Sequence, residues 1–201
     1  ARPVTQLHWG GGTPTFLSEQ QMETLMAETR RHFNVASDDR AEIGIELDPR
    51  EVREPTLRVL REIGFNRASL GIQDFEPVVQ KAVNRIQSEA LTGRVIDEAR
   101  RVGFRSVSVD LIYGLPYQTP ATMTATLGKI VALDPDRISI YNYAHLPERF
   151  APQRRLDPAT MPSPAVKLDL LELCIDRFTA AGYVYIGMDH FAKPTDELAR
   201  A

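Results

Sequence analysis

Short segments in which hydrophobic and polar residues alternate recur along this chain, and longer segments with helical periodicity separate them. Alternation with a period of two predicts β-strands, because successive side chains of a strand point to opposite faces. The predicted strands are Thr5–Trp9, Glu42–Leu47, Arg67–Gln73, Ser106–Tyr113, Arg137–Tyr143 and Tyr183–Gly187. Strands that alternate with helices over short connections predict a parallel α/β sheet with right-handed crossovers.

The helical segments begin and end at recognisable residues. Ser18 and Gln21 have the spacing of a capping box. Residues of capping type also precede a proline at three predicted helix starts, Glu54-Pro55, Thr119-Pro120 and Ser163-Pro164. Three helices are predicted to end at a glycine followed by an aromatic residue, at Gly64, Gly103 and Gly182.

Three of the predicted strands have one apolar face and one face of small or polar residues. The polar faces consist of Glu42, Gly44 and Glu46, of Arg67, Ser69, Gly71 and Gln73, and of Ser106, Ser108 and Asp110. Parallel strands that are buried on both faces normally read as continuous apolar runs. Burial of unpaired polar groups is also costly. We therefore expect these faces to line a wet or ligand-filled interior, which favours a barrel or half-barrel over a doubly wound sheet.

Composition narrows the class of protein. The 201 residues are 43% apolar and 25% charged, as in one ordinary globular domain. A net charge of −3 gives no electrostatic argument for nucleic acid or an anionic membrane, and no apolar run is long enough to span a bilayer. One cysteine, Cys174, excludes an internal disulfide, which makes a reducing cytoplasm the expected location. Because the chain opens without methionine, we expect it to be a piece of a longer protein.

The triplet Gly10-Gly11-Gly12 follows the first predicted strand. Glycine has no Cβ and allows the backbone to approach a ligand closely. Ligands of parallel α/β proteins bind at the carboxyl ends of strands. From the glycines alone, a plain tight turn is the favoured alternative.

Glu46, Gln73 and Asp110 fall late in their strands on the polar faces, where a carboxylate can accept hydrogen bonds from a ribose hydroxyl or an amine. The other candidates have simpler interpretations. Asp48 before Pro49 is expected in a turn, Asp74 at a helix cap and Arg85 in solvent, whereas Cys174 on an apolar helix stripe is expected in the core. The spacing of His8, His145 and His190 does not indicate a metal site.

Six segments together carry a resemblance to a known family. They are Leu7–Pro14, Ile45–Pro49, Gly71–Phe75, Asp110–Pro116, Asn142–Pro147 and Gly187–Ala192. In order and spacing they resemble motifs of the oxygen-independent coproporphyrinogen III oxidases, or coproporphyrinogen dehydrogenases, of the radical S-adenosylmethionine (SAM) superfamily. The resemblance covers essentially the whole chain.

The resemblance implies a partial (β/α)6 TIM-like barrel of the radical SAM type, here with its first strand missing and occupying residues 1–201. It implies oxidative decarboxylation of two propionates of coproporphyrinogen III to give protoporphyrinogen IX in haem biosynthesis. A [4Fe–4S] cluster would reduce SAM to methionine and a 5′-deoxyadenosyl radical, with electrons from a donor that the sequence does not identify.

The family resemblance also implies site residues. Gly11 and Glu46 would contact the SAM ligated to the cluster. A second SAM site would be lined by Gly12, Thr13, Gln73, Arg85, Asp110 and Ala144.

The family's C-x3-C-x2-C cluster motif is absent from this sequence. Because cluster iron needs thiolate ligands, we expect this chain by itself to bind no cluster and to be inactive. We expect the cluster loop and a C-terminal domain to lie in the rest of a longer protein. Two other functions stay open: a haem chaperone of a related group, and a SAM-binding module without catalysis.

Overall fold

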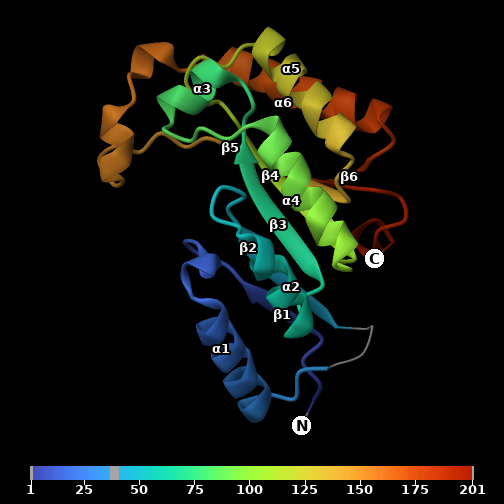
Figure 1. Ribbon diagram of the computed structural model, residues 1–201. Coiled ribbons are helices and arrows are strands. Elements are labelled where there is room, and N and C mark those ends of the chain that lie inside the picture. Colours follow the sequence, from blue (N-terminus) through green and yellow to red (C-terminus); the bar gives the residue numbers. More distant parts are fainter. Residues whose placement is uncertain (1, 37–40, 201) are drawn as a thin grey trace. The chain divides into compact units, whose positions relative to one another are not determined.

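The computed structural model describes residues 2–36 and 41–200 (Figure 1). The strands are β1 (Gln6–Trp9), β2 (Glu42–Leu47), β3 (Arg67–Gln73), β4 (Ser106–Tyr113), β5 (Arg137–Asn142), β6 (Val184–Gly187) and β7 (His190–Ala192). The α-helices are α1 (Glu19–His32), α2 (Glu54–Glu62), α3 (Pro77–Ala82), α4 (Glu89–Arg101), α5 (Pro120–Leu133) and α6 (Pro164–Ala180). Short 3-10 helices are η1 (Pro14–Phe16), η2 (Ala151–Arg155), η3 (Pro158–Thr160) and η4 (Glu197–Ala199).

The strands form one sheet in the order β1-β2-β3-β4-β5-β7-β6. The pairs β1–β2 and β2–β3 are parallel, whereas β5–β7 and β7–β6 are antiparallel. Within the described part of the chain, β1 and β6 form the two edges and the sheet does not close. This confirms the predicted α/β class and agrees with an incomplete barrel.

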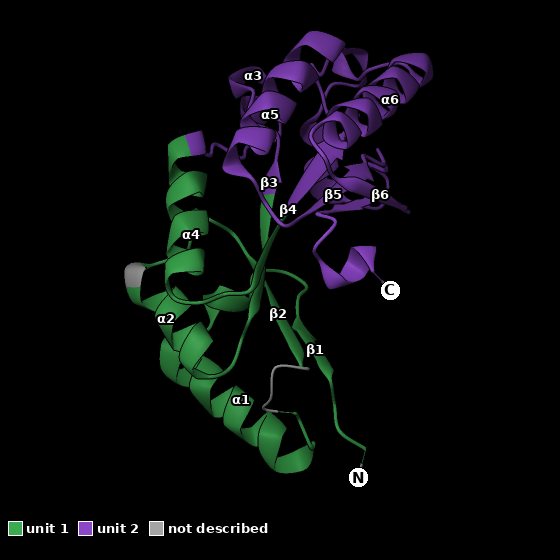
Figure 2. Ribbon diagram, turned by 90° about the vertical axis from the view of Figure 1, so that its right-hand side faces the viewer, with its two compact units in different colours: residues 1–71, 90–108 green, residues 72–89, 109–201 purple. Residues whose placement is uncertain are grey.

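The chain divides into two compact units (Figure 2). Unit 1 comprises residues 1–71 and 90–108, and its helices α1, α2 and α4 lie on one side of its strands. Unit 2 comprises residues 72–89 and 109–201, and in it α5 packs against α6. Each unit has buried apolar side chains. They are Met22, Met26, Ile45, Leu57, Leu60 and Phe65 in unit 1, and Leu127, Ile130, Leu170, Phe178 and Phe191 in unit 2.

The alternation predicted for the strands is present in the structure. In β3, buried Ala68, Leu70 and Ile72 alternate with partly exposed residues, which include Gln73 at the end of the strand. The apolar face packs under the helices, and the polar face keeps access to solvent. The predicted bounds of β2, β3 and β4 are all confirmed.

Most of the predicted helix signals are confirmed. Ser18 and Thr119 both form capping boxes, and the Ser163 hydroxyl accepts a hydrogen bond from Val166 N. One prediction was wrong: Glu54 does not cap α2, because it is already the first helical residue. Arg53 occupies the cap position and makes no side-chain capping bond, so proline alone marks this helix start.

The predicted parallel sheet omitted one antiparallel strand near the C-terminus. After β6 the chain turns back as β7, which lies between β5 and β6 and is antiparallel to both. The turn is formed by Met188 and Asp189, with φ angles of 47° and 68°. Two successive left-handed residues suit the tight turn of a hairpin. Neither residue is a glycine or an asparagine, the types from which such a turn would have been predicted.

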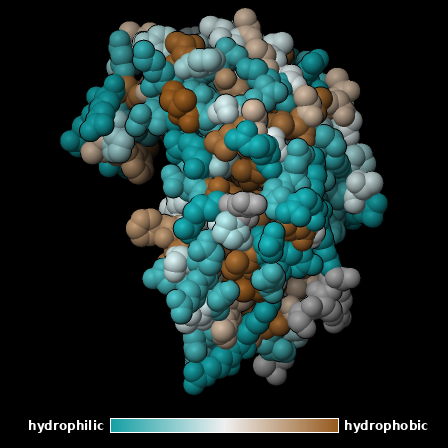
Figure 3. Space-filling model, viewed as in Figure 1, coloured by the Kyte–Doolittle hydropathy of each residue, from teal (hydrophilic) through white to brown (hydrophobic). Residues whose placement is uncertain are grey.

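Hydrophobic side chains on the visible surface are interspersed with hydrophilic ones (Figure 3). Among the described residues, Phe16, Phe33, Leu168 and Met188 are large hydrophobic side chains that are exposed on one face or another. Across residues 2–36 and 41–200, the structure contains no helix with the length and apolar composition that a membrane span requires.

Candidate functional site

The Gly10-Gly11-Gly12 triplet leaves the carboxyl end of β1 beside the carboxyl end of β2. In the parallel register, His8 lies opposite Gly44 and Trp9 lies opposite Ile45. Gly44 leaves space for the His8 ring, because a Cβ there would lie 3.0 Å from His8 Nδ1. The histidine therefore lies over β2 on its polar face, the face that carries Glu46.

The Glu46 carboxylate is held by two groups. Gly11 N donates a hydrogen bond of 3.1 Å to Glu46 Oε2, and His8 Nε2 lies 3.3 Å from Glu46 Oε1. A Cβ on Gly10 would lie 2.5 Å from Glu46 Oε1 and 2.9 Å from His8 Nε2. A side chain at position 10 would therefore displace the Glu46 carboxylate and the His8 ring from these positions.

The next two glycines have a different role. Gly11 and Gly12 have φ angles of 81° and 73°, and a Cβ on either would meet no atom within 4 Å. These positions need glycine for its backbone conformation, and the space beside them is open. The side chain of Glu46 remains 44% exposed, so a ligand beside the glycines can reach the carboxylate.

This arrangement fits SAM. Each oxygen of the carboxylate has one partner and retains a further lone pair, so it can still accept a hydrogen bond from a ribose hydroxyl or an ammonium group. Backbone without Cβ atoms allows a ligand to approach closely. Unit 1 therefore brings together Gly11, Gly12 and Glu46 of the predicted residues, with Thr13 directly after them at the start of η1.

The sequence interpretation missed His8, which it treated as an isolated histidine. The period-two alternation already places His8 on the face opposite Leu7 and Trp9. The register of β1 against β2, which a sequence does not reveal, brings it to Glu46.

Gln73, Arg85, Asp110 and Ala144 all belong to unit 2. Gln73 is the last residue of β3 and has a φ angle of 71°, which is uncommon for a residue other than glycine. Such strain persists only where the surroundings impose it, and it concentrates at functional sites. Asp110 and Arg85 are partly buried, whereas Ala144 is exposed two residues after β5.

A buried network fixes the chain directly after Gln73. Asp74 is 1% exposed, and its Oδ1 accepts hydrogen bonds from Thr126 Oγ1 (2.6 Å) and Glu76 N (2.8 Å). Its Oδ2 accepts one from Gln118 Nε2 (2.6 Å). The prediction that Asp74 caps a helix was wrong: Glu76 occupies the cap position of α3, and Asp74 instead forms a turn with Glu76 N and joins this loop to α5.

Two further predictions are confirmed. Asp48 forms a turn, because its Oδ1 accepts a hydrogen bond from Arg50 N (3.0 Å), and its side-chain bond to Arg50 raises the pKa of the guanidinium. Cys174 is fully buried in the core of unit 2, and this burial raises the pKa of its thiol to about 12.

A [4Fe–4S] cluster does not fit the residues of this chain. Cluster iron is held by cysteine thiolates, and the one cysteine in the sequence is the buried, protonated Cys174. No group of three or more potential metal-ligating side chains occurs in the part of the chain that the structure describes.

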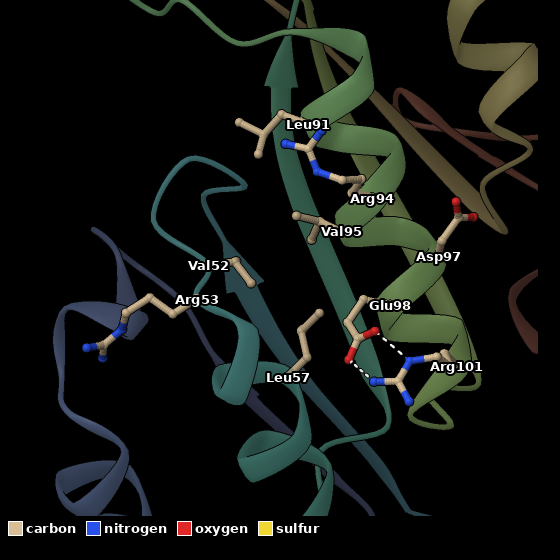
Figure 4. A pocket seen from close by; sticks show the side chains of 9 residues that line it. All are labelled: Val52, Arg53, Leu57, Leu91, Arg94, Val95, Asp97, Glu98 and Arg101. Atoms are coloured by element: carbon tan, nitrogen blue, oxygen red, sulfur yellow. Dashed lines mark hydrogen bonds and ion pairs between the residues drawn. The ribbon is translucent and has the colours of Figure 1, made fainter.

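A cavity of about 630 Å³ lies between α2 and α4 (Figure 4). Its charged side chains are partly paired: Arg101 Nη2 lies 2.6 Å from Glu98 Oε1, and Arg53 is paired with Glu19. The hydrogen bond with Arg101 lowers the pKa of Glu98. None of the residues predicted to bind SAM lines this cavity.

Comparison with known proteins gives three results. Residues 1–130 match the Radical SAM superfamily. The chain is 55% identical over 198 residues to the oxygen-independent coproporphyrinogen III oxidase of Pseudomonas aeruginosa, covering 98% of this chain and 43% of that protein. It is 52% identical over 200 residues to the Escherichia coli protein of the same name, covering 100% of this chain and 43% of the relative.

Solved structures agree. The structure of coproporphyrinogen III oxidase from Escherichia coli, described as a radical SAM enzyme, matches with a TM-score of 0.95 and 52% identity over 100% of this chain and 46% of that one. Elp3 of the archaeon Methanocaldococcus infernus matches with a TM-score of 0.65 at 14% identity, over 84% of this chain and 44% of that chain. That second likeness shows the fold alone. The chain spans less than half the length of the curated relatives.

Proposed function

We propose that this chain, which belongs to the radical SAM superfamily, is the SAM-binding part of an oxygen-independent coproporphyrinogen III oxidase. The observation that carries the proposal is the Glu46 carboxylate, held by Gly11 N–H beside two open glycines. The names of the highly identical relatives support the choice of substrate.

In this reaction, each of two propionates of coproporphyrinogen III loses carbon dioxide, one proton and two electrons and becomes a vinyl group. SAM would supply the chemistry that removes a hydrogen atom, that is the proton and one electron, and an electron acceptor would take the second electron. The chain's own residues bind and orient: Glu46 accepts hydrogen bonds from SAM, His8 fixes the carboxylate and the glycines admit SAM to the backbone. No step is assigned to the cluster, since this chain provides no ligands for it.

A second SAM site is part of the proposal. Gly12, Thr13, Gln73, Arg85, Asp110 and Ala144 would line it, by resemblance to the family. The left-handed conformation of Gln73 supports a functional role at this position. The proposed partners are SAM, coproporphyrinogen III and an electron donor, and the proposed location is the cytoplasm, where a lone buried thiol stays reduced.

Calorimetric titration with SAM tests the proposed site. Glu46→Gln removes the charge and retains the shape of the side chain, and we expect SAM affinity to fall about tenfold or more, the usual effect of losing a charged hydrogen-bond acceptor. Glu51→Gln removes a charge from the exposed turn just beyond β2 and should leave affinity unchanged. Equal affinity of wild type and Glu46→Gln would refute the role of Glu46.

The reaction is tested with the protein expressed from its whole coding sequence and reconstituted anaerobically. Formation of protoporphyrinogen IX from coproporphyrinogen III and SAM is the expected result. Stable haem binding without turnover would instead favour a chaperone. SAM binding with neither turnover nor haem binding would favour a module without catalysis.

A further inference from the structure

A second cavity, of about 410 Å³, lies within unit 2 at the carboxyl ends of β4 and β5 and the first turn of α6. Its polar lining residues are Asn142, His145 and Lys167, and no acidic residue lines it. The N-terminus of α6 adds positive potential at this position. The positive charge of Lys167 therefore has no acidic partner among the residues that line the cavity.

The position of the lysine is fixed by its surroundings. Lys167 Nζ donates a hydrogen bond of 2.9 Å to the Tyr143 carbonyl. Its stem lies over Gly114, where a Cβ would be 2.7 Å from Lys167 Cε. An ammonium group has three N–H donors, so two remain after the bond to Tyr143.

Two polar atoms lack partners on the loop whose Tyr143 carbonyl accepts the hydrogen bond from Lys167. His145 Nδ1 and the Tyr143 hydroxyl are buried, and within the described residues neither has a hydrogen-bond partner. Buried polar groups are nearly always paired in folded proteins. His145 itself lines the cavity, and Tyr143 lies between it and the lining residue Asn142, so the loop beside the cavity has hydrogen-bonding capacity that no described residue uses.

The remaining walls are apolar. Met161, Pro162 and Leu168 line the cavity together with the Tyr113 ring. A phosphate dianion would normally be met by several cations or by bidentate arginine. One lysine and one imidazole beside apolar walls suit a singly charged carboxylate on a short alkyl arm.

We propose that this cavity binds the carboxylate of an alkanoate side chain and, in the reaction proposed above, holds a propionate of the porphyrinogen that is not decarboxylated. This inference rests on the proposed function. Coproporphyrinogen III carries four propionates, of which two react, so the enzyme must orient the macrocycle by groups that stay intact. A contact with one unreactive propionate fixes the orientation of the macrocycle. The reacting propionate is thereby positioned although this cavity does not touch it.

The test uses coproporphyrin III, the oxidised and fluorescent form of the substrate, titrated into this chain and followed by fluorescence anisotropy. Leu168 is 69% exposed and lines the cavity, so its substitution should leave folding intact. Leu168→Glu and Leu168→Gln differ only in charge, and we expect Leu168→Glu to bind about tenfold more weakly than Leu168→Gln.

The lysine provides a second pair of variants. Lys167→Met retains the stem and loses the charge, and should also weaken binding about tenfold, whereas Lys167→Arg should retain most of the affinity. Lys81→Met removes an exposed charge of the same unit outside the cavity and should have no effect. Circular dichroism confirms that each variant is folded.

The outcomes are distinct. Charge-dependent binding at both Leu168 and Lys167 supports the subsite. Equal affinities of Leu168→Glu and Leu168→Gln, or no porphyrin binding by the wild-type chain, refute it. The titration with SAM tests Glu46 independently of porphyrin binding, and neither refuting result would change it. Failure of the subsite and failure of the proposed function are therefore distinguishable.

Discussion

The buried Asp74 carboxylate offers a direct test of how the loop after β3 is held. Asp74→Ala removes the acceptor of three hydrogen bonds, from Thr126, Gln118 and Glu76 N. Two of these donors keep another interaction: Gln118 Nε2 also donates to the Ile112 carbonyl, and Thr126 Oγ1 accepts from Phe75 N. The loss is therefore only partly compensated.

The magnitude follows from these contacts. A hydrogen bond to a charged group contributes about 1.5–3 kcal/mol, and a buried donor left unpaired costs about 1–3 kcal/mol. Allowing for the remaining partners of Thr126 and Gln118, we expect Asp74→Ala to lower the free energy of unfolding by about 3 kcal/mol. That is a large part of the roughly 5–15 kcal/mol of a typical protein.

The asparagine variant, Asp74→Asn, tests the geometry. In either orientation of the introduced side-chain amide, its NH2 group would face a donor, either Gln118 Nε2 on one side or Glu76 N on the other. Gln118 cannot relieve this contact by turning over, because its Oε1 accepts a hydrogen bond from Leu115 N (2.9 Å). We expect Asp74→Asn to cost about 1–3 kcal/mol, the penalty for one unpaired buried group.

Urea unfolding followed by circular dichroism at 222 nm measures the effect. With a denaturant slope of about 2 kcal/mol/M, a loss of 3 kcal/mol lowers the midpoint by about 1.5 M. Asp169→Ala deletes an exposed carboxylate on α6 in the same unit and should leave the midpoint nearly unchanged. If Asp74→Ala unfolds at the same urea concentration as Asp169→Ala, the network does not hold the loop as argued.

Three further predictions concern single sites. Gly10→Ala should weaken SAM binding about tenfold in calorimetry, because its Cβ would lie 2.5 Å from Glu46 Oε1 and displace the carboxylate, whereas Gly128→Ala in α5, with no atom within 4 Å, should not. The Cys174 thiol, whose pKa is raised to about 12, should resist alkylation at pH 9 until urea unfolds the chain. Since the unfolded thiol loses its proton first, stability should fall as pH rises above about 9; a flat profile between pH 9 and 11 would contradict this. Ser163→Ala should cost about 1 kcal/mol in urea unfolding and Ser163→Asp almost nothing, because the side chain caps α6.

The sequence determined most of the local structure. Period-two alternation predicted β2, β3 and β4 to the residue. One face of each strand packs on helices and the other is polar, so apolar and polar residues alternate along its sequence. Capping at Ser18, Thr119 and Ser163 was equally visible, since a cap and the amide it binds lie within three residues.

Tertiary structure decided what depends on distant residues. The His8–Glu46 pair joins two strands 38 residues apart, and the β1–β2 register that creates it is set by packing of the whole sheet. The β7 strand was missed because Met188 and Asp189 are not typical of a hairpin turn and are held in left-handed conformations. The sequence predicted Asp74 as a helix cap. It could not show the hydrogen bonds of Asp74 to Gln118 and Thr126, because these partners lie more than 40 residues away along the chain.

At the glycine triplet, both the local sequence and the tertiary structure contribute to the site. The sequence by itself predicted a turn after the first strand and favoured a plain tight turn over a ligand-binding loop, because glycine's lack of a Cβ is a local property that suits both. Only the fold distinguished the three positions: a Cβ at Gly10 would displace the Glu46 carboxylate, whereas Gly11 and Gly12 have left-handed backbone beside open space. Local sequence fixes the conformations that each segment permits, and contacts between distant segments select which of them becomes a site.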